Sequence, residues 1–437
     1  MVVVLMGVSG SGKTTVGQIL AKRLGWQCTF VTERRPAKVS RVERIQYQVQ
    51  GGATRANHYC TRTFENATRQ AIAVYAALKA RPDLRPDLVV GHSGFGTTLF
   101  LRELYPGIPI VNYFEYFYRT RDSDMDFRPD FPSTELDRLR VRARNAMILL
   151  DLDNCDAGYS PTLWQRDRLP AEYHSKISVI HDGIDTTIWK PDPAPPRVVG
   201  DCTIPQEMKV VTYATRGMES MRGFDIFVQA AARLAARRSD VLFLVAGEDR
   251  ICYGGDARFI GGKSFKQWAL EQAGLDPSRV RFLGLLAQRQ LARLFQLTDC
   301  HVYLTVPFVL SWSLLNALAC GAPVVASDTP PVREVIEHGR TGLLTDFFDA
   351  DALASTIEKV IDDPEAHRRL GQAGVELVAQ RYATDVCLPL LSHSFESVVG
   401  LSASSRSCVF ADTERFPPLP PCSSRTSSEV QQCSRCE

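Results

Sequence analysis

Pro191-Asp192-Pro193-Ala194-Pro195-Pro196 divides this sequence into two halves of similar pattern. Four prolines in six residues cannot continue a helix or a central strand, because proline lacks the amide hydrogen and fixes its own backbone angle. The stretch therefore predicts a linker. On both sides of it, short β-branched runs alternate with helical patterns, which is typical of βα units around a parallel sheet. We expect an α/β protein with two Rossmann-like, doubly wound parallel-sheet domains.

Before the linker, short apolar runs fit strands that are buried on both faces. The segment from Ser133 to Leu150 fits a helix, with an apolar stripe made of Leu136, Leu139, Ala143, Ala146, Met147 and Leu150. The strands are expected at Val2–Val8, Cys28–Thr32, Asp87–Gly91, Ile108–Phe114 and Ile177–His181.

After the linker the alternation restarts. Helices are expected at Phe224–Arg237, Gln288–Leu297, Leu314–Cys320 and Pro331–His338, and strands at Lys209–Thr215, Val241–Ala246, Val280–Leu283, His301–Thr305 and Pro323–Ala326. We therefore expect a first domain over residues 27–195 and a second over residues 196–400. Ligands of such sheets bind beyond the carboxyl ends of the strands, which predicts a site between the two domains. Residues 401–437 are rich in Ser, Pro, Arg and Cys without periodicity, which predicts a disordered tail.

Composition narrows the class of protein further. The chain has 437 residues, enough for two cores, and a formal net charge of +2, which gives no case for nucleic-acid binding. No run approaches the roughly 20 apolar residues of a transmembrane helix, and no signal-peptide pattern opens the chain. We expect a cytoplasmic protein, for which weak association with a membrane surface stays open. Its scattered cysteines are expected to be buried thiols rather than disulfides.

A phosphate-binding motif stands near the beginning of the chain. Gly7-Val8-Ser9-Gly10-Ser11-Gly12-Lys13-Thr14 fits the P-loop pattern, with an apolar strand before it and a helical pattern after it. Gly7, Gly10 and Gly12 would let backbone N–H groups turn toward phosphate oxygens. Lys13 would neutralise phosphate charge, and Thr14 would contact Mg²⁺ if the loop is active.

Residues 1–26 resemble the start of a gluconate kinase of the P-loop class. A kinase also needs a second acidic group for the metal and an acceptor site, and neither is evident after Trp26. Two interpretations stay open. The segment is either a phosphotransferase element or a strand–loop–helix unit that completes the first sheet.

A second resemblance covers residues from about 27 to 400. Matching segments occur in order along both halves: Phe30–Glu33, Gly91–Phe100, Tyr113–Arg119, Ser160–Gln165, Ile180–Thr186, Arg222–Phe224, Val302–Thr305, Pro307–Leu315 and Ser327–Glu334. On these segments the chain resembles the retaining family 4 glycosyltransferases, which have the two-domain GT-B fold. The resemblance implies transfer of a sugar from a nucleoside diphosphate sugar to an acceptor hydroxyl. It implies no catalytic metal or other cofactor, and a sugar, lipid-linked or glycan acceptor.

The resemblance also implies a donor site in the second domain. Arg216 at a predicted strand end and Arg222 before a predicted helix match the basic pair that grips the donor diphosphate. Ser311 begins another helix, whose free N–H groups would take a phosphate. The glutamate pair of the family falls here on Phe308 and Asn316. Asn316 can still hydrogen-bond ribose hydroxyls, but it offers no charged acceptor.

Two residues of the first domain complete the expected site. His92 and Glu115 each follow a predicted strand, so both should face the cleft, where His92 would bind the transferred sugar or acceptor and Glu115 would orient the acceptor hydroxyl. A packing role for His92 and an ion pair with Arg119 or Arg121 for Glu115 are the structural alternatives. Three functions are therefore open: a glycosyltransferase, a P-loop phosphotransferase resembling gluconate kinase, and a catalytically impaired GT-B nucleotide-binding protein.

Overall fold

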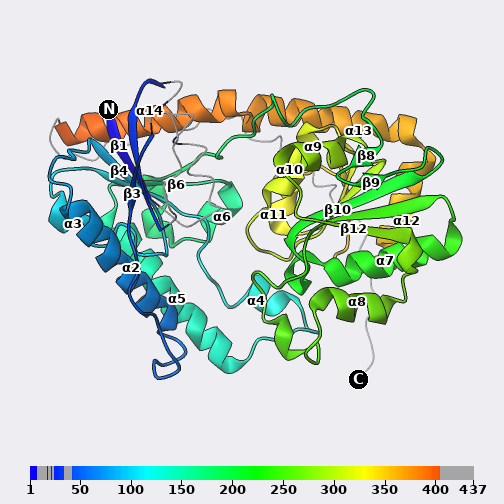
Figure 1. Cartoon of the computed structure of the whole chain (residues 1–437), viewed down its shortest axis with the longest axis horizontal. Coiled ribbons are helices and arrows are strands. Elements are labelled where there is room, and N and C mark those ends of the chain that lie inside the picture. Colours follow the sequence, from blue (N-terminus) through cyan, green and yellow to red (C-terminus); the bar gives the residue numbers. More distant parts are fainter. Residues whose placement is uncertain (7–16, 18–20, 22–23, 34–41, 404–437) are drawn as a thin grey trace, which may run out of the picture. The chain divides into compact units, whose positions relative to one another are not determined.

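The computed structural model describes residues 1–6, 17, 21, 24–33 and 42–403. All of them belong to one compact unit, Met1–Arg406, which contains two parallel β-sheets (Figure 1). Residues 191–197 between the sheets form neither helix nor strand, as the prolines predict. The predicted α/β class with two parallel sheets is confirmed.

The first sheet has seven parallel strands in the order β3-β2-β1-β4-β5-β6-β7. Its strands are β1 (Val2–Met6), β2 (Gln27–Thr32), β3 (Val42–Gln46), β4 (Leu88–His92), β5 (Ile110–Tyr113), β6 (Ala157–Ser160) and β7 (Ile177–Val179). The helices of this half are α2 (Arg62–Lys79), α3 (Leu101–Leu104), α4 (Asp124–Phe127), α5 (Glu135–Asn154) and α6 (Leu163–Asp167). The order reverses between β1 and β4, so the ends of β4 and β5 lie beside a topological switch point, where α/β sheets bind ligands.

The second sheet has six parallel strands in the order β12-β11-β10-β13-β14-β15. They are β10 (Lys209–Gly217), β11 (Val241–Glu248), β12 (Val280–Gly284), β13 (Cys300–Tyr303), β14 (Val324–Ser327) and β15 (Leu343–Thr345). The helices are α7 (Phe224–Arg237), α8 (Phe265–Ala273), α9 (Gln288–Gln296), α10 (Trp312–Ala319), α11 (Pro330–Arg333), α12 (Ala350–Asp362) and α13 (Pro364–Leu377), and a short hairpin pairs β8 (Val198–Val199) with β9 (Cys202–Thr203). Its switch point lies between β10 and β13.

The last described helix, α14 (Thr384–Ala403), returns to the first sheet. Leu388, Leu391, Phe395 and Val398 belong to the same hydrophobic cluster as Val3 in β1. Figure 1 shows α14 continuing from the region of α13 along the side of the molecule that carries β1. The chain therefore crosses between its two halves twice. The helix ends at Ala403, slightly beyond residue 401, where the tail was expected to begin.

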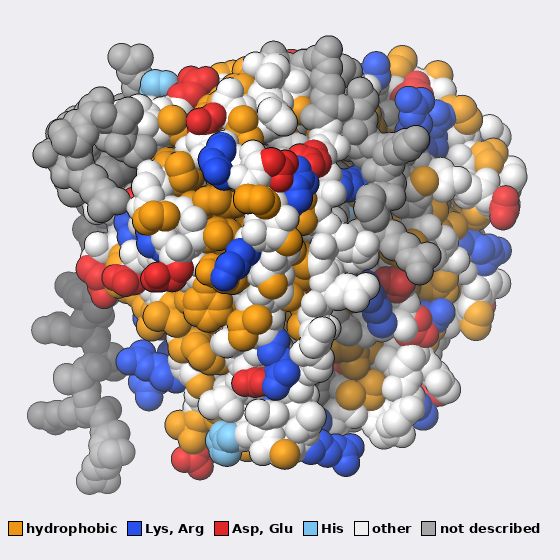
Figure 2. Space-filling view, turned by 60° about the vertical axis from the view of Figure 1, so that its left-hand side comes forward, with side chains coloured by type: hydrophobic (Ala, Val, Ile, Leu, Met, Phe, Trp, Pro, Cys, Tyr) orange, Lys and Arg blue, Asp and Glu red, His pale blue; other side chains and the backbone are white. Residues whose placement is uncertain are grey.

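Helix α5 buries a different face from the one suggested by its leucines. Leu136, Leu139 and Leu150 are 44%, 58% and 40% exposed, whereas its buried face carries Asn145 and Asp151 beside Val141, Ile148 and Leu152. These polar residues are buried because they find partners: Asn145 exchanges hydrogen bonds with the backbone of Tyr118, and Asp151 accepts from Ser93 and Gly94. Figure 2 shows hydrophobic side chains with lysines and arginines between them on the side of the molecule that it brings forward.

The remaining expectations concern helix α11, the cysteines, membrane spans and the P-loop. Helix α11 has four residues, because the chain turns after Glu334 where a helix to His338 was expected. The eight cysteines of the described part are free thiols, as predicted, but Cys60, Cys202 and Cys252 are only partly buried. Within the same part, no helix has the length and apolar character needed to cross a bilayer. The P-loop residues Gly7, Gly10, Gly12, Lys13 and Thr14 lie outside the described residues.

Candidate functional site

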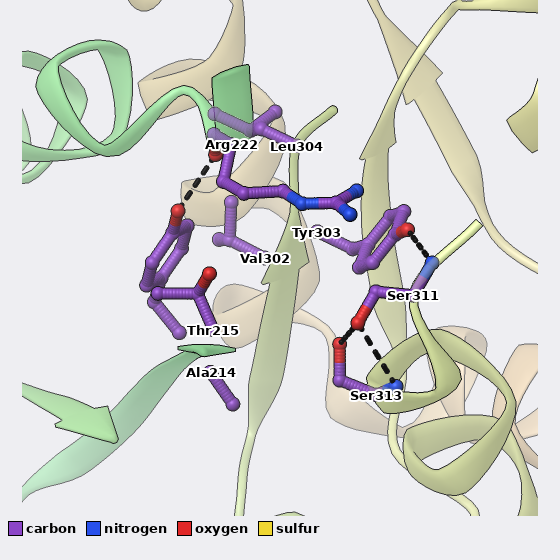
Figure 3. A pocket seen from close by; sticks show the side chains of 9 residues that line it. Ala214, Thr215, Arg222, Val302, Tyr303, Leu304, Ser311 and Ser313 are labelled. Carbon is purple, nitrogen blue, oxygen red and sulfur yellow. Dashed lines mark hydrogen bonds between the residues drawn. The ribbon is translucent and has the colours of Figure 1, made fainter. Parts of the chain in front are cut away.

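A small polar pocket lies at the switch point of the second sheet (Figure 3). It is formed by the ends of β10 and β13, the turn before α7 and the start of α10. Its lining consists of Tyr213, Ala214, Thr215, Arg222, Val302, Tyr303, Leu304, Ser311 and Ser313. Two of the residues expected to bind the donor, Arg222 and Ser311, therefore meet in one pocket.

Arg222 is held rigidly in this pocket. Its Nη1 donates to Thr305 Oγ1 at 2.7 Å and to the carbonyl oxygen of Val309 at 3.0 Å. The Tyr213 hydroxyl donates to the carbonyl oxygen of Arg222 at 2.6 Å. Gly223 makes this turn possible, because its φ of +63° is unfavourable for other residues and a Cβ there would lie 2.8 Å from the Leu304 Cβ. The guanidinium is thus fixed before any ligand arrives, which lowers the entropy cost of binding.

Arg216 lies close to Arg222 in a more exposed setting. It is the penultimate residue of β10, and its side chain is exposed. A hydrogen bond with the Tyr253 side chain raises the pKa of Arg216 further above its ordinary value. The Arg222 guanidinium carbon lies 5.5 Å from the centre of that same Tyr253 ring. Tyr253 therefore connects the two cations.

The first turn of helix α10 forms the opposite wall. Ser311 caps the helix, with its Oγ 3.4 Å from the backbone nitrogen of Ser313 and 3.0 Å from the Ser313 hydroxyl. The backbone N–H of Ser311 donates to the Tyr303 hydroxyl at 2.8 Å. The positive end of the helix dipole therefore faces the same space as Arg222, an arrangement suited to an anion.

Phe308 and Asn316 occupy the positions where the family pattern has glutamates. Phe308 is 6% exposed, and its ring centre lies 4.7 Å from that of Tyr116 and 5.4 Å from that of Tyr253. Asn316 is 8% exposed, and its Oδ1 has no hydrogen-bond partner among the described residues. Neither Asn316 nor Arg216 is part of the pocket lining, so the expected donor residues are only partly brought together.

His92 and Glu115 meet at the switch point of the first sheet. His92 ends β4, Glu115 lies two residues beyond β5, and His92 Nε2 lies 3.5 Å from Glu115 Oε2. His92 Nδ1 is 3.2 Å from the carbonyl oxygen of Ser93, which favours a proton on that nitrogen. The Glu115 side chain is 48% exposed, so it is available to a ligand. The ion pairs of Glu115 with Arg119 or Arg121 that sequence reasoning considered do not form.

The electrostatics relate this pair to the second half. The protein around the half-exposed Glu115 carboxylate removes part of its hydration and so favours the neutral form, but the hydrogen bond and charge of His92 and the charges of Arg222 and Arg216 outweigh this effect and lower the pKa of Glu115. The halves also touch nearby, because the Tyr116 hydroxyl donates to the carbonyl oxygen of Pro307 at 3.3 Å. An ionised carboxylate of the first half thus acts on the two cations of the second.

Sequence reasoning missed Asp182 as a site residue, although it lies in the matched segment Ile180–Thr186. Burial raises its pKa to about 7, and the charge of Glu115 adds to the shift. Its Oδ2 is buried without a hydrogen-bond partner among the described residues. Asp182 follows β7 and Glu115 follows β5, so the two residues come close only in the folded chain. The sequence alone carried no signal of this proximity. The part of the chain that the structure describes holds no cluster of His, Cys, Asp or Glu suited to a metal ion.

Comparison with known proteins relates both halves of the chain to glycosyltransferases. Residues 24–189 match the model of the glycosyl transferase family 4 group, and residues 202–376 match that of the glycosyl transferases group 1. The chain is a glycosyltransferase family 4-like protein. The resemblance of residues 1–26 to a gluconate kinase finds no support in these comparisons.

Individual relatives of this glycosyltransferase family 4-like protein are distant. D-inositol 3-phosphate glycosyltransferase of Corynebacterium glutamicum is 27% identical over 63% of this chain and 63% of its own length. Alpha-maltose-1-phosphate synthase of Mycolicibacterium smegmatis is 30% identical over 49% of this chain and 55% of its own length. The chain thus spans about half to two thirds of these curated relatives.

Solved structures support the GT-B fold. Sucrose-phosphate synthase from Thermosynechococcus elongatus aligns with a TM-score of 0.69 at 18% identity, over 93% of this chain and 100% of the other. HepE from Anabaena, solved in complex with UDP, aligns with a TM-score of 0.63 at 16% identity, over 91% of this chain and 100% of the other.

Proposed function

We propose that the chain is a glycosyltransferase that moves a sugar from a nucleoside diphosphate sugar to a hydroxyl group of an acceptor, with retention at the anomeric carbon. The observation that carries the proposal is the position of Arg222 in the pocket at the carboxyl end of β10 and β13, facing the start of α10. The donor departs as a nucleoside diphosphate, so the site must stabilise negative charge as the glycosidic bond breaks. Fixed cations and a helix N-terminus provide that stabilisation without a metal.

Each residue then has a role. Arg222 and Arg216 bind the diphosphate, and the Ser311 end of α10 adds its dipole. Glu115, ionised beside His92, accepts a hydrogen bond from the acceptor hydroxyl and orients it toward the anomeric carbon. His92 Nε2 lies 3.5 Å from Glu115 Oε2, so a sugar hydroxyl that binds Glu115 would also meet His92.

The relatives suggest testing nucleotides as ligands first. Two of the named relatives carry glycosyltransferase or synthase names, and HepE was solved with UDP. A thermal-shift titration with UDP, GDP, ADP and ATP is therefore the first experiment. Ligands that bind only the folded state stabilise it, by about 2.7 kcal/mol when the free ligand concentration is one hundred times Kd. We expect a nucleoside diphosphate to raise Tm and the matching nucleotide sugar to be turned over; stabilisation by ATP alone would contradict the proposal.

A second candidate function is nucleotide binding without turnover. It is favoured by Phe308, because an aromatic ring buried against Tyr116 and Tyr253 replaces a carboxylate of the family pattern. Nucleotide-dependent stabilisation with no release of sugar or nucleoside diphosphate, across a panel of nucleotide sugars and polyol acceptors, would favour this candidate.

A further inference from the structure

A concentration of arginines lies beside the acceptor side of the candidate site. They come from the loop after β5, from helix α5 and from the residue that follows α6. The five residues are Arg119, Arg121, Arg142, Arg144 and Arg168, and we call them the arginine cluster. None of them was assigned a binding role above.

Most of the cluster is held in place by neutral groups. Arg119 donates to the carbonyl oxygen of Arg168 from Nε at 3.0 Å and from Nη2 at 2.7 Å, and Arg168 Nη2 donates to the carbonyl oxygen of Arg121 at 3.3 Å. Arg119, Arg144 and Arg168 lie over the rings of Phe117, Tyr118 and Trp164 at 4.8, 3.9 and 5.5 Å. These contacts orient the guanidinium groups and leave their positive charge uncompensated.

The charge of the cluster lacks matching carboxylates. Within the described residues, none of the five arginines forms an ion pair; neighbouring Asp167 pairs with Arg166 instead. Burial and then the charges of Arg168 and Arg142 lower the pKa of Arg119, and Glu172 offsets only part of this repulsion. The buried acid Asp124 accepts from the Tyr116 hydroxyl at 2.9 Å; burial raises its pKa to about 6, and the charges of Arg144 and Arg168 offset only part of that shift.

One donor of the cluster is also unsatisfied. Arg168 Nε is buried and has no hydrogen-bond partner among the described residues. A buried donor without a partner is unfavourable, because it has lost its hydrogen bond to water and gained none from the protein. An anion would both satisfy this donor and relieve the repulsion between the arginines.

The position of the cluster relates it to the acceptor. Arg168 lies over Trp164, whose ring stacks with that of Tyr116 at 6.1 Å. The carbonyl oxygen of Glu115 accepts from Gln165 Nε2 at 2.5 Å, and Gln165 belongs to the same helix as Trp164. The cluster is thus connected through α6 to the residue proposed to orient the acceptor hydroxyl.

We propose that Arg119, Arg142 and Arg168 form an anion-binding subsite that takes the phosphate group of a small phosphorylated acceptor. Guanidinium forks match phosphate oxygens in geometry and charge. That the ligand is the sugar acceptor rests on the proposed function, whereas the binding of phosphate does not. A phospholipid headgroup presents the same chemistry, and the vesicle experiment below distinguishes it from a small phosphorylated ligand.

Binding is measured by isothermal titration with inorganic phosphate, glycerol 3-phosphate and glycerol, and by sedimentation with phosphatidylcholine vesicles with and without phosphatidylglycerol. The variants are Arg119→Ala, Arg168→Ala and Arg142→Ala; Arg142 is exposed, so its replacement keeps the fold if the other two do not. Arg138→Ala on the same helix α5 is the matched control, because Arg138 is exposed and donates to the carbonyl oxygen of Ser133. Arg216→Ala controls for phosphate bound at the proposed donor site, beside the pocket.

We expect glycerol 3-phosphate to bind and glycerol not to bind. Arg119→Ala, Arg168→Ala and Arg142→Ala should each weaken this binding about tenfold or more, the loss of one charged hydrogen bond, while Arg138→Ala and Arg216→Ala should not. Phosphate affinity that depends on Arg216 alone would overturn the proposal, as would binding to anionic vesicles without binding of glycerol 3-phosphate. Loss of nucleotide-sugar turnover with intact glycerol 3-phosphate binding would contradict the proposed function and leave the subsite standing.

Discussion

Arg128 of the first half places its guanidinium against the carboxylate of Asp225 at the start of α7, with Nη1 2.9 Å from Oδ1 and Nη2 2.6 Å from Oδ2. Both side chains are about 5% exposed. Arg128 Nη1 also donates to the carbonyl oxygen of Ser220, in the turn that leads to Arg222. This bidentate pair joins the two halves directly beside the donor pocket.

Removing one member of that pair should be costly. We expect Arg128→Met to lower the free energy of unfolding by about 3–5 kcal/mol, because Asp225 is left as an uncompensated buried charge. The double variant Arg128→Met/Asp225→Leu should recover most of the loss. Urea unfolding of the four proteins of this cycle measures the coupling, and a loss in the double variant equal to the sum of the two single losses would show that the two residues are not coupled.

The donor cations should matter for turnover. Arg216→Ala and Arg222→Ala should each reduce the rate of sugar transfer about a hundredfold or more, the scale of losing one charge-stabilising donor. Arg250→Ala is the control, because Arg250 is an exposed cation on the same edge of the sheet whose charge is already paired with Glu248. The test compares the steady-state rates of sugar transfer of the variants and the wild type at a saturating nucleotide sugar concentration. Full activity in both arginine variants would show that the basic pair has no role in transfer.

Asp182 should make stability depend on pH. Its folded pKa of about 7 lies above the ordinary 3.8, because burial disfavours the ionised form. Between these two values the folded state binds more protons than the unfolded state, so this residue makes stability fall as pH rises from about 4 to about 7.

Asp182→Asn removes the titration, and we expect it to raise stability at pH 8 relative to the wild type by no more than about 4 kcal/mol. The difference should vanish near pH 4. Thermal unfolding at both pH values measures it, and a variant that is less stable at pH 8 would contradict the assignment.

Asn316→Glu tests the departure from the family pattern. A glutamate there would offer a charged acceptor to ribose hydroxyls, so we expect tighter binding of the nucleotide sugar. Because the position is 8% exposed, the same change should destabilise the protein without ligand. Asn316→Gln is the uncharged control of equal length. Calorimetry with and without ligand separates the two effects, and unchanged affinity would mean that the ribose is bound elsewhere.

The sequence predicted much of the fold and only part of the site. Strands β1, β2, β4 and β5 are apolar and β-branched, so their pattern is unambiguous. β6, with the sequence Ala-Gly-Tyr-Ser, was not expected as a strand. Position 158 requires glycine, because a Cβ there would lie 2.5 Å from the Phe114 ring. Packing rather than intrinsic propensity therefore makes this segment a strand. β3 escaped prediction because, at the sheet edge, it carries charged residues between Val42 and Ile45.

The site residues also divide into those that a local sequence pattern reveals and those that only folding brings together. Arg222 could be located because it belongs to a short matched segment just before a predicted helix. The arginine cluster could not, because its members are distributed over three separate segments and become neighbours only through folding. Asp182 was matched as part of a segment, but its buried carboxyl becomes visible only once Tyr113 and Glu115 surround it.

The return of α14 to the first sheet has a consequence for how the protein is made. Leu388, Leu391, Phe395 and Val398 reach the hydrophobic cluster around β1 only after nearly the whole of the second half has been synthesised. Domains usually fold in the order in which they leave the ribosome, the amino-terminal one first. Here the second sheet can complete its core while the first still exposes apolar surface, so the half that is translated first is the half that finishes last.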